Sequence, residues 1–108
     1  MGNNPNFLSN SEKEKIVRLG YEGPYLVNSG DILRSEFFRW VRKTHRYHHY
    51  IVPCGNHIHY NFDIVLPSTV EYSSLWNEDE KYTTYEEAEI SCVSKVIEMI
   101  EKDLGYIK

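Results

Sequence analysis

Residues 83–104 read TTYEEAEISCVSKVIEMIEKDL, and this stretch decides the fold. Thr84 and Glu87 have the spacing of a capping box, in which each side chain bonds the backbone N–H of the other residue. Apolar residues then recur every three or four positions, which places them on one face of an α-helix. They are Ala88, Cys92, Val93, Val96, Ile97, Ile100 and Leu104. The stretch therefore predicts an amphipathic helix over about residues 85–104 that stops at Gly105.

Two further helices are expected before this one. Ser11 and Glu14 form another capping-box pair, and a short helix that starts there can end at Gly20. Residues 21–30 contain the loop-forming residues Gly and Pro, and Asp31 is positioned to cap a helix over about 32–45. One side of that helix is largely apolar, with Phe38 near its border. This side carries Leu33, Phe37, Trp40, Val41 and Thr44.

A β-hairpin is the clearest element of the middle of the chain. Two segments rich in β-forming residues, 48–52 and 57–64, flank the turn sequence PCGN at 53–56. If Cys54 and Gly55 form a two-residue turn, Ile51 lies opposite Ile58. Alternation then assigns one set of side chains to the core face: Tyr47, His49, Ile51, Ile58, Tyr60, Phe62 and Ile64. It assigns another set to the opposite face: His48, Tyr50, Val52, His57, His59, Asn61 and Asp63.

The rest of the chain completes a small α+β fold. Residues 69–72 can form a third strand, residues 81–83 can form another short one, and residues 77–80 read as a solvated loop. We therefore expect two main helices packed on one face of a two- to three-stranded antiparallel sheet, preceded by a short N-terminal helix. At 108 residues there is room for one domain, which we assign to residues 11–108, after a flexible N-terminus at residues 1–10.

Two segments resemble a known family. Residues 35–45 (SEFFRWVRKTH), followed by a hairpin, and residues 84–98 (TYEEAEISCVSKVIE) resemble small proteins of gut Bacteroidales and their phages and mobile elements. Residues 15–22 (KIVRLGYE) are similar to the opening of these proteins. The chain departs from the family pattern at Val41 and Ser91, and in a shorter connection between the first two helices. The resemblance implies the fold and a phage or mobile-element origin, but the family has no assigned activity or catalytic residues.

Charge is distributed unevenly along the chain. Residues 1–46 carry a net charge of +3 and residues 47–108 a net charge of −7. The positive charge includes a stripe on the second helix, formed by Arg39, Arg42, Lys43 and Arg46. Such a stripe can contact phosphates, and the Tyr/His face of the sheet could stack on bases, so nucleic-acid binding is one functional hypothesis. The glutamates that begin the last helix oppose it, because they would repel phosphate.

Histidine is the second functional signal, since five histidines lie between residues 45 and 59. The expected hairpin brings His48, His57 and His59 to one face, and two imidazoles on one strand can bind a metal ion. However, no carboxylate or second cysteine completes a ligand set at a recognised spacing. Histidine also fits a half-exposed strand beside tyrosine, so we expect structural histidines and no metal or other cofactor.

Motifs typical of catalysis are missing from the sequence, which contains no Gly-rich phosphate loop, nucleophile elbow or HExxH. The sequence therefore predicts a non-catalytic protein-interaction or regulatory module that binds a protein partner or forms a homodimer. A small nucleic-acid-binding protein is the alternative. The candidate binding residues are Arg39, Arg42, Lys43, Arg46, His48, Tyr50, His57 and His59.

The sequence also predicts the cellular location of the protein and the environments of its cysteines and of Trp76. We expect a cytoplasmic protein without a membrane contact or small-molecule substrate, because no apolar run is long enough to span a bilayer and no secretion signal is visible. In a reducing cytosol Cys92 would be a small buried hydrophobic residue rather than half of a disulfide with Cys54. Trp76, isolated in a polar segment, is expected to cover the core rather than to stand exposed as an anchor.

Overall fold

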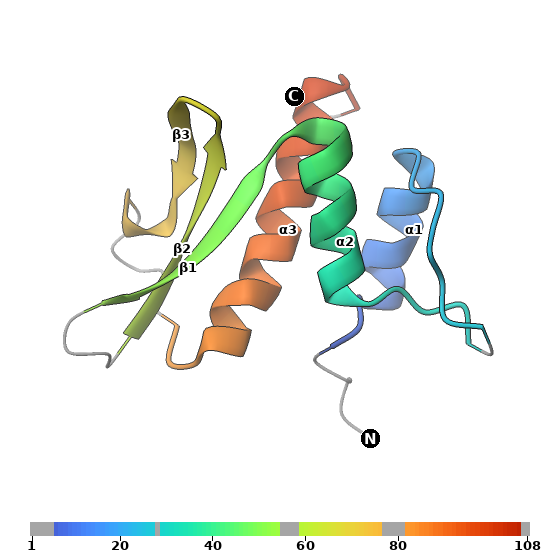
Figure 1. Cartoon of the computed structure of the whole chain (residues 1–108), viewed down its shortest axis with the longest axis horizontal. Coiled ribbons are helices and arrows are strands. Elements are labelled where there is room, and N and C mark those ends of the chain that lie inside the picture. Colours follow the sequence, from blue (N-terminus) through green and yellow to red (C-terminus); the bar gives the residue numbers. More distant parts are fainter. Residues whose placement is uncertain (1–5, 28, 55–58, 77–81, 107–108) are drawn as a thin grey trace.

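The computed structural model describes residues 6–27, 29–54, 59–76 and 82–106, which form an α+β fold, as the sequence predicts. The strands form an antiparallel sheet in the order β1-β2-β3, and the helices lie together on one side of it (Figure 1). The elements are α1 (Asn10–Arg18), α2 (Arg34–Trp40), η1 (Val41–His45), β1 (His48–Cys54), β2 (His59–Leu66), β3 (Thr69–Ser73), η2 (Ser74–Trp76) and α3 (Tyr85–Asp103). Within this described part of the chain no helix is both long and apolar enough to cross a membrane.

Helix α3 packs against β1 and β2, and α1 also contacts it. The predicted apolar face is confirmed: of its seven residues, all are buried except Leu104, which follows the last residue of the helix and is exposed. Thr84 is the N-cap, and its Oγ1 accepts a hydrogen bond from the Glu87 N–H at 3.1 Å. The Glu87 carboxylate instead accepts from the N–H and hydroxyl of Thr83, so half of the predicted capping box forms.

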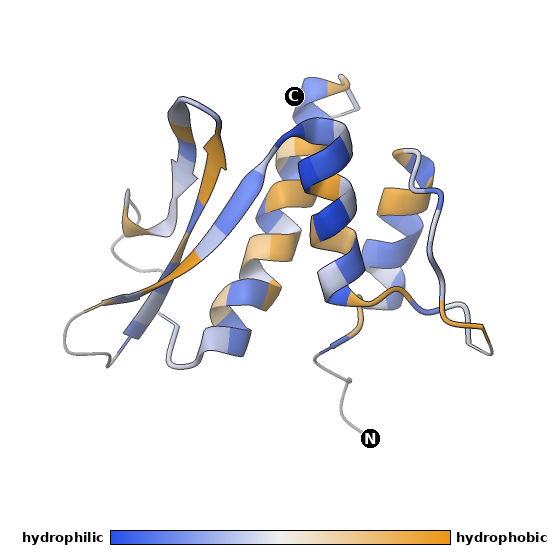
Figure 2. Ribbon diagram, viewed as in Figure 1, coloured by the Kyte–Doolittle hydropathy of each residue, from blue (hydrophilic) through white to orange (hydrophobic). Residues whose placement is uncertain are grey.

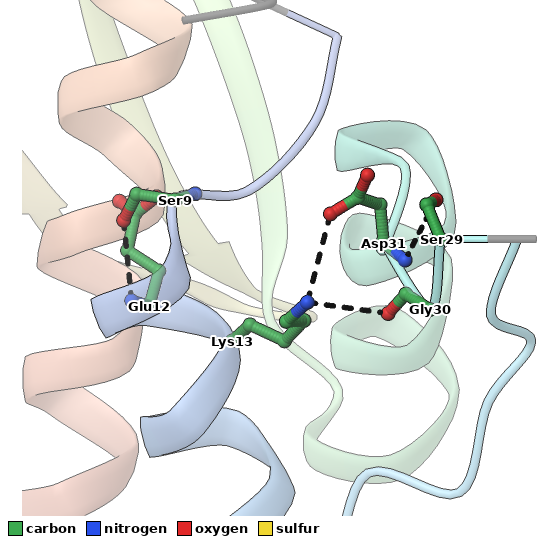
Figure 3. Close-up of polar contacts among 6 residues, drawn as sticks. All are labelled: Ser9, Glu12, Lys13, Ser29, Gly30 and Asp31. Carbon is green, nitrogen blue, oxygen red and sulfur yellow. Dashed lines mark hydrogen bonds and ion pairs between the residues drawn. The ribbon is translucent and has the colours of Figure 1, made fainter.

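The first helix begins earlier than predicted, and its cap is Ser9 rather than Ser11. The Ser9 Oγ accepts from the Glu12 N–H at 3.2 Å, while the Glu12 carboxylate accepts from the Ser9 N–H at 2.9 Å (Figure 3). The reason lies outside the helix, because Leu8 is buried in the core and its N–H donates to the Ile32 carbonyl at 3.0 Å. Residues 7–10, which the sequence analysis assigned to the N-terminal segment, therefore include a β-bridge, a core residue and the start of α1.

Helix α2 begins at Arg34, and the prediction that Asp31 caps it is wrong. Leu33 forms a β-bridge with Phe7, which holds its backbone extended and delays the helix. Asp31 instead pairs with Lys13, whose Nζ lies 3.5 Å from the carboxylate and also donates to the Gly30 carbonyl at 3.4 Å (Figure 3). The helical segment continues as η1, which has the wider π-helical turn, and ends at His45 as expected. Its buried side includes Phe38, whereas Thr44 is exposed.

The hairpin has a different register from the predicted one. Ile51 lies opposite Phe62 rather than Ile58, and the predicted turn residue Cys54 instead belongs to β1, where it pairs with His59. His57 and Ile58 lie outside the described residues. The register differs by four positions, an even number, so each described residue keeps its predicted face. We call the helix-covered side, with Phe62 and Ile64, the inner face and the opposite side, with Tyr50, the outer face.

The segment after the hairpin is confirmed in part. The predicted third strand is β3, whereas the predicted strand at 81–83 is reduced to a bridge between Tyr60 and Tyr82. Residues 77–81 lie outside the described part, including the predicted loop at 77–80. Trp76 does not cover the core: it is 66% exposed and touches Tyr72 edge-on, because η2 carries the chain away from the end of β3.

Candidate interaction surfaces

The predicted basic stripe forms an exposed surface on α2, η1 and the residue that follows. Arg39, Arg42, Lys43 and Arg46 are all exposed, and within the described ranges none of them is in an ion pair. The hydrophilic upper turns of the α2–η1 helical segment face the viewer in Figure 2. Arg46 ends the helical segment with a left-handed φ of 64° and leads into β1. We call these four residues the basic surface.

A groove of about 610 Å³ lies beside the basic surface, between the helix and the loop that follows α1. Arg39, Lys43 and the Trp40 ring line it from the helix. Two carboxylates, those of Glu22 and Glu36, line the same groove. Charges of both signs therefore meet in it, which makes the groove a poorer phosphate site than the cations alone would suggest.

The outer face of the sheet exposes aromatic and apolar side chains. Tyr50 is 54% exposed and Val70 is 45% exposed, while His48, Val52 and Val65 are half-buried. On the other side of β1, the Phe38 ring of α2 stacks on His49 with ring centroids 3.6 Å apart, so α2 covers the inner face. The basic surface and the outer face thus lie on opposite sides of the sheet. The single nucleic-acid platform expected from the sequence becomes two separate surfaces.

The predicted histidine cluster is divided by the register of the hairpin. His48 lies opposite Val65 and His59 lies opposite Cys54, so these two histidines occupy opposite ends of the ribbon. Six residues of strand separate them, which is about 20 Å. His57, the third member, lies outside the described residues. The part of the chain that the structure describes contains no group of three His, Cys, Asp or Glu side chains that could hold a metal ion.

An internal ion-pair cluster joins α2, β1 and α3, and the sequence analysis missed it. The Arg34 Nε donates to Glu89 at 2.7 Å, and His49 Nε2 lies 3.1 Å from the other carboxylate oxygen. The hydrogen bond from His49, followed by that from Arg34, lowers the pKa of Glu89 despite its burial. Arg34 lies three and four positions before Phe37 and Phe38, so helical spacing could have placed it on the buried side.

Burial shifts the pKa of two further side chains, both on the helical segments. Burial lowers the pKa of His45, although the nearby Asp103 opposes the change, and the His45 ring packs edge-on against Trp40. Both cysteines are free, and burial raises the pKa of the Cys92 thiol well above its usual range. Cys92 is therefore a packed apolar residue, as predicted.

Comparisons with family models, with curated proteins and with solved structures found no match to this chain. The resemblance of residues 35–45 and 84–98 to the Bacteroidales family stays a prediction.

Proposed function

We propose that this protein is a non-catalytic protein-interaction or regulatory module of phage or mobile-element type, and that the outer face of its sheet contacts another protein chain. The resemblance at residues 35–45 and 84–98 supports the origin. A cytoplasmic location is part of the proposal, since the two cysteines are free and a reducing compartment would keep them so.

One observation carries the proposal: α1, α2 and α3 lie on the inner side and leave Tyr50 and Val70 about half exposed on the outer face. The Asn61 part of the outer face, by contrast, is buried beside η2, where the Ser74 hydroxyl donates to the Asn61 side chain. A solvated sheet face normally alternates to polar side chains. Here the β1 part of the outer face is His48, Tyr50 and Val52, without a Lys, Arg, Asp or Glu. Tyrosine is enriched in protein interfaces because it combines a large apolar area with a polar group.

Site-specific photo-crosslinking tests this surface in cells. Tyr50 is replaced by p-benzoyl-phenylalanine, a similar aromatic residue, and irradiation is expected to give a discrete crosslinked protein species that mass spectrometry then identifies. Tyr106 is the matched control, because it is 57% exposed and follows the end of α3 rather than belonging to a strand. Equal crosslinking at both positions, or none at position 50, would contradict the proposal.

Nucleic-acid binding is the second candidate, and the basic surface favours it. Four exposed cations without ion pairs in the described structure are available to neutralise phosphates. The carboxylates of Glu22 and Glu36 in the adjoining groove weaken this candidate. It ranks second because the outer face, with its aromatic side chains, lies on the opposite side of the sheet and cannot stack on the same strand.

Fluorescence anisotropy at low salt, with labelled single- and double-stranded probes, tests the second candidate. Replacing Arg42 and Arg46 by Ala is expected to weaken binding at least ten-fold and to reduce its salt dependence. The control replaces Lys15 and Arg18, two exposed cations of α1, and removes the same charge elsewhere. If the wild type does not bind at low salt, or if the control has the same effect, the basic surface is not a nucleic-acid site.

A further inference from the structure

The two edges of the sheet differ in how well they resist pairing with another strand. β3 is five residues long, carries the exposed Glu71, is joined to β2 with a register shift, and gives way to η2. A short length, a charge and an irregularity are the features by which edge strands avoid association. β1 has seven residues in unbroken register with β2 and contains no Lys, Arg, Asp or Glu. Pro53, near the end of β1, is the only residue of this strand that opposes pairing, because proline has no N–H to donate.

The free edge of β1 is open in the described structure. β1 pairs with β2 alone, and no other described segment forms a ladder with it. The helices lie against the inner face rather than alongside this edge, as the stacking of Phe38 on His49 shows. The free edge of β1 has N–H and C=O groups that can bond a further strand, except that Pro53 offers only its C=O.

We propose that a second copy of this chain pairs with β1 along this edge, antiparallel, to form a continuous sheet across a two-fold axis. This inference rests on the proposed function and names its partner and its interface. A two-fold axis normal to the sheet relates the two strands and places both helical layers on the same side. Directly opposed residues must then come from the same face, so one residue lies opposite its own copy and the axis passes midway between the two. The centre of the seven-residue strand is Ile51.

The side chains of β1 suit this self-pairing. With the axis at Ile51, Tyr50 lies opposite the partner subunit's Val52, and an aromatic residue opposite a β-branched one is a favoured cross-strand pair. The exposed Tyr50 ring thus gains a neighbour on the outer face. No like charges meet, because Arg46 lies two residues before β1 and the two copies of Arg46 are about 30 Å apart in an antiparallel pair.

A pair of lysine substitutions separates the β1 edge from the rest of the outer face. Sedimentation equilibrium of the full chain, over a concentration series, is expected to show a dimer that dissociates on dilution. The substitution Tyr50→Lys places two positive charges near the axis and should weaken dimerisation at least ten-fold. Val70→Lys is the matched control, because it adds the same charge to the same face but at the β3 edge, and it should leave the dimer intact. Circular dichroism confirms that both variants fold.

The outcomes also separate this inference from the proposed function. A wild type that is monomeric throughout, or a Val70→Lys effect equal to that of Tyr50→Lys, would overturn β1 self-pairing. If position 50 still crosslinks to a different protein in cells, the outer face is a contact surface and only the identity of the partner changes. If no crosslink and no dimer form, both proposals fail.

Discussion

The inner and outer faces of the sheet are built from alternate residues of the same strands, yet their environments differ sharply. On the inner face Tyr47 is 6% exposed and Phe62 is 2% exposed, whereas Tyr50 on the outer face is 54% exposed. The β2 part of the outer face is polar, with His59, Asn61 and Asp63, whereas the β1 part carries Tyr50 and Val52. These two residues differ from inner-face residues in their cover, because α1, α2 and α3 all lie on the inner side. An inner-face substitution should therefore lower stability, and an outer-face substitution should lower association.

The largest expected difference is between two aromatic residues, one on each face. Phe62→Ala should lower the free energy of unfolding by about 4 kcal/mol, because it empties a fully packed site beneath α3. Tyr50→Ala should change it by less than about 0.5 kcal/mol when the protein is dilute enough to be monomeric. Urea denaturation followed by circular dichroism measures both values. Equal losses would mean that the outer face is covered within one chain.

The faces of the hairpin could be predicted from the sequence, but its register could not. Alternation depends only on the pleat of each strand, and it placed Phe62 and Ile64 correctly on the buried side. Register depends on the connection, and Cys54, which the local turn signal placed in the turn, is the last residue of β1 and pairs with His59. The predicted cluster of His48 and His59 depended on that register and was lost with it.

Helices show the same division between local and long-range information. The bounds and buried face of α3 follow from its period and its N-cap, both of which are local, and the structure confirms them. The sequence analysis placed the cap of α1 at Ser11, but the burial of Leu8 made Ser9 the cap. The partnership of Arg34 with Glu89 spans 55 positions, so no local pattern could reveal it.

The cluster that links the helices to the inner face gives the second prediction. Glu89→Gln should lower the free energy of unfolding by about 3 kcal/mol, because the Arg34 guanidinium, with its side chain only 9% exposed, would lose its counter-charge. Glu98→Gln is the control, since Glu98 pairs with Lys95 and Lys102 at the surface and should cost about 0.5 kcal/mol or less. Urea denaturation at pH 7 compares the two variants. Similar small losses in both would show that the cluster does not stabilise the inner side.

The same carboxylate makes stability depend on pH. The pKa of Glu89 is lowered by its hydrogen bonds to His49 and Arg34, so its folded value lies below the ordinary value of 4.5. A depressed carboxylate contributes its full stability above the unfolded pKa and loses it as the pH falls through the folded one. The wild type should therefore lose stability below about pH 4.5 more steeply than Glu89→Gln. Parallel curves of unfolding free energy against pH for the two proteins would refute this.

A smaller effect is expected at the helix that covers the inner face. Thr84→Ala should lower the free energy of unfolding by about 1 kcal/mol, because the Glu87 N–H would lose the acceptor that caps α3. Thr44→Ala is the control, because Thr44 is exposed in η1 and is not a cap. Thermal unfolding monitored by circular dichroism ranks the two. Helix propensity alone would make Thr44→Ala neutral or slightly stabilising, so a control that is as destabilised as Thr84→Ala would show that the loss is not specific to the cap.

The smallest expected change is on the outer face, where Val70→Thr keeps the shape of the side chain and adds a hydroxyl. Val70 is 45% exposed, so water can solvate that hydroxyl and the free energy of unfolding should change by less than about 0.5 kcal/mol. Val96→Thr makes the same change at a fully buried position of α3 and should cost about 1–3 kcal/mol. Denaturation at two protein concentrations extends the test, because dimerisation makes apparent stability depend on concentration. If Val70→Thr is costly only at the higher concentration, a second chain covers the β3 side of the outer face, and pairing along β1 alone is wrong.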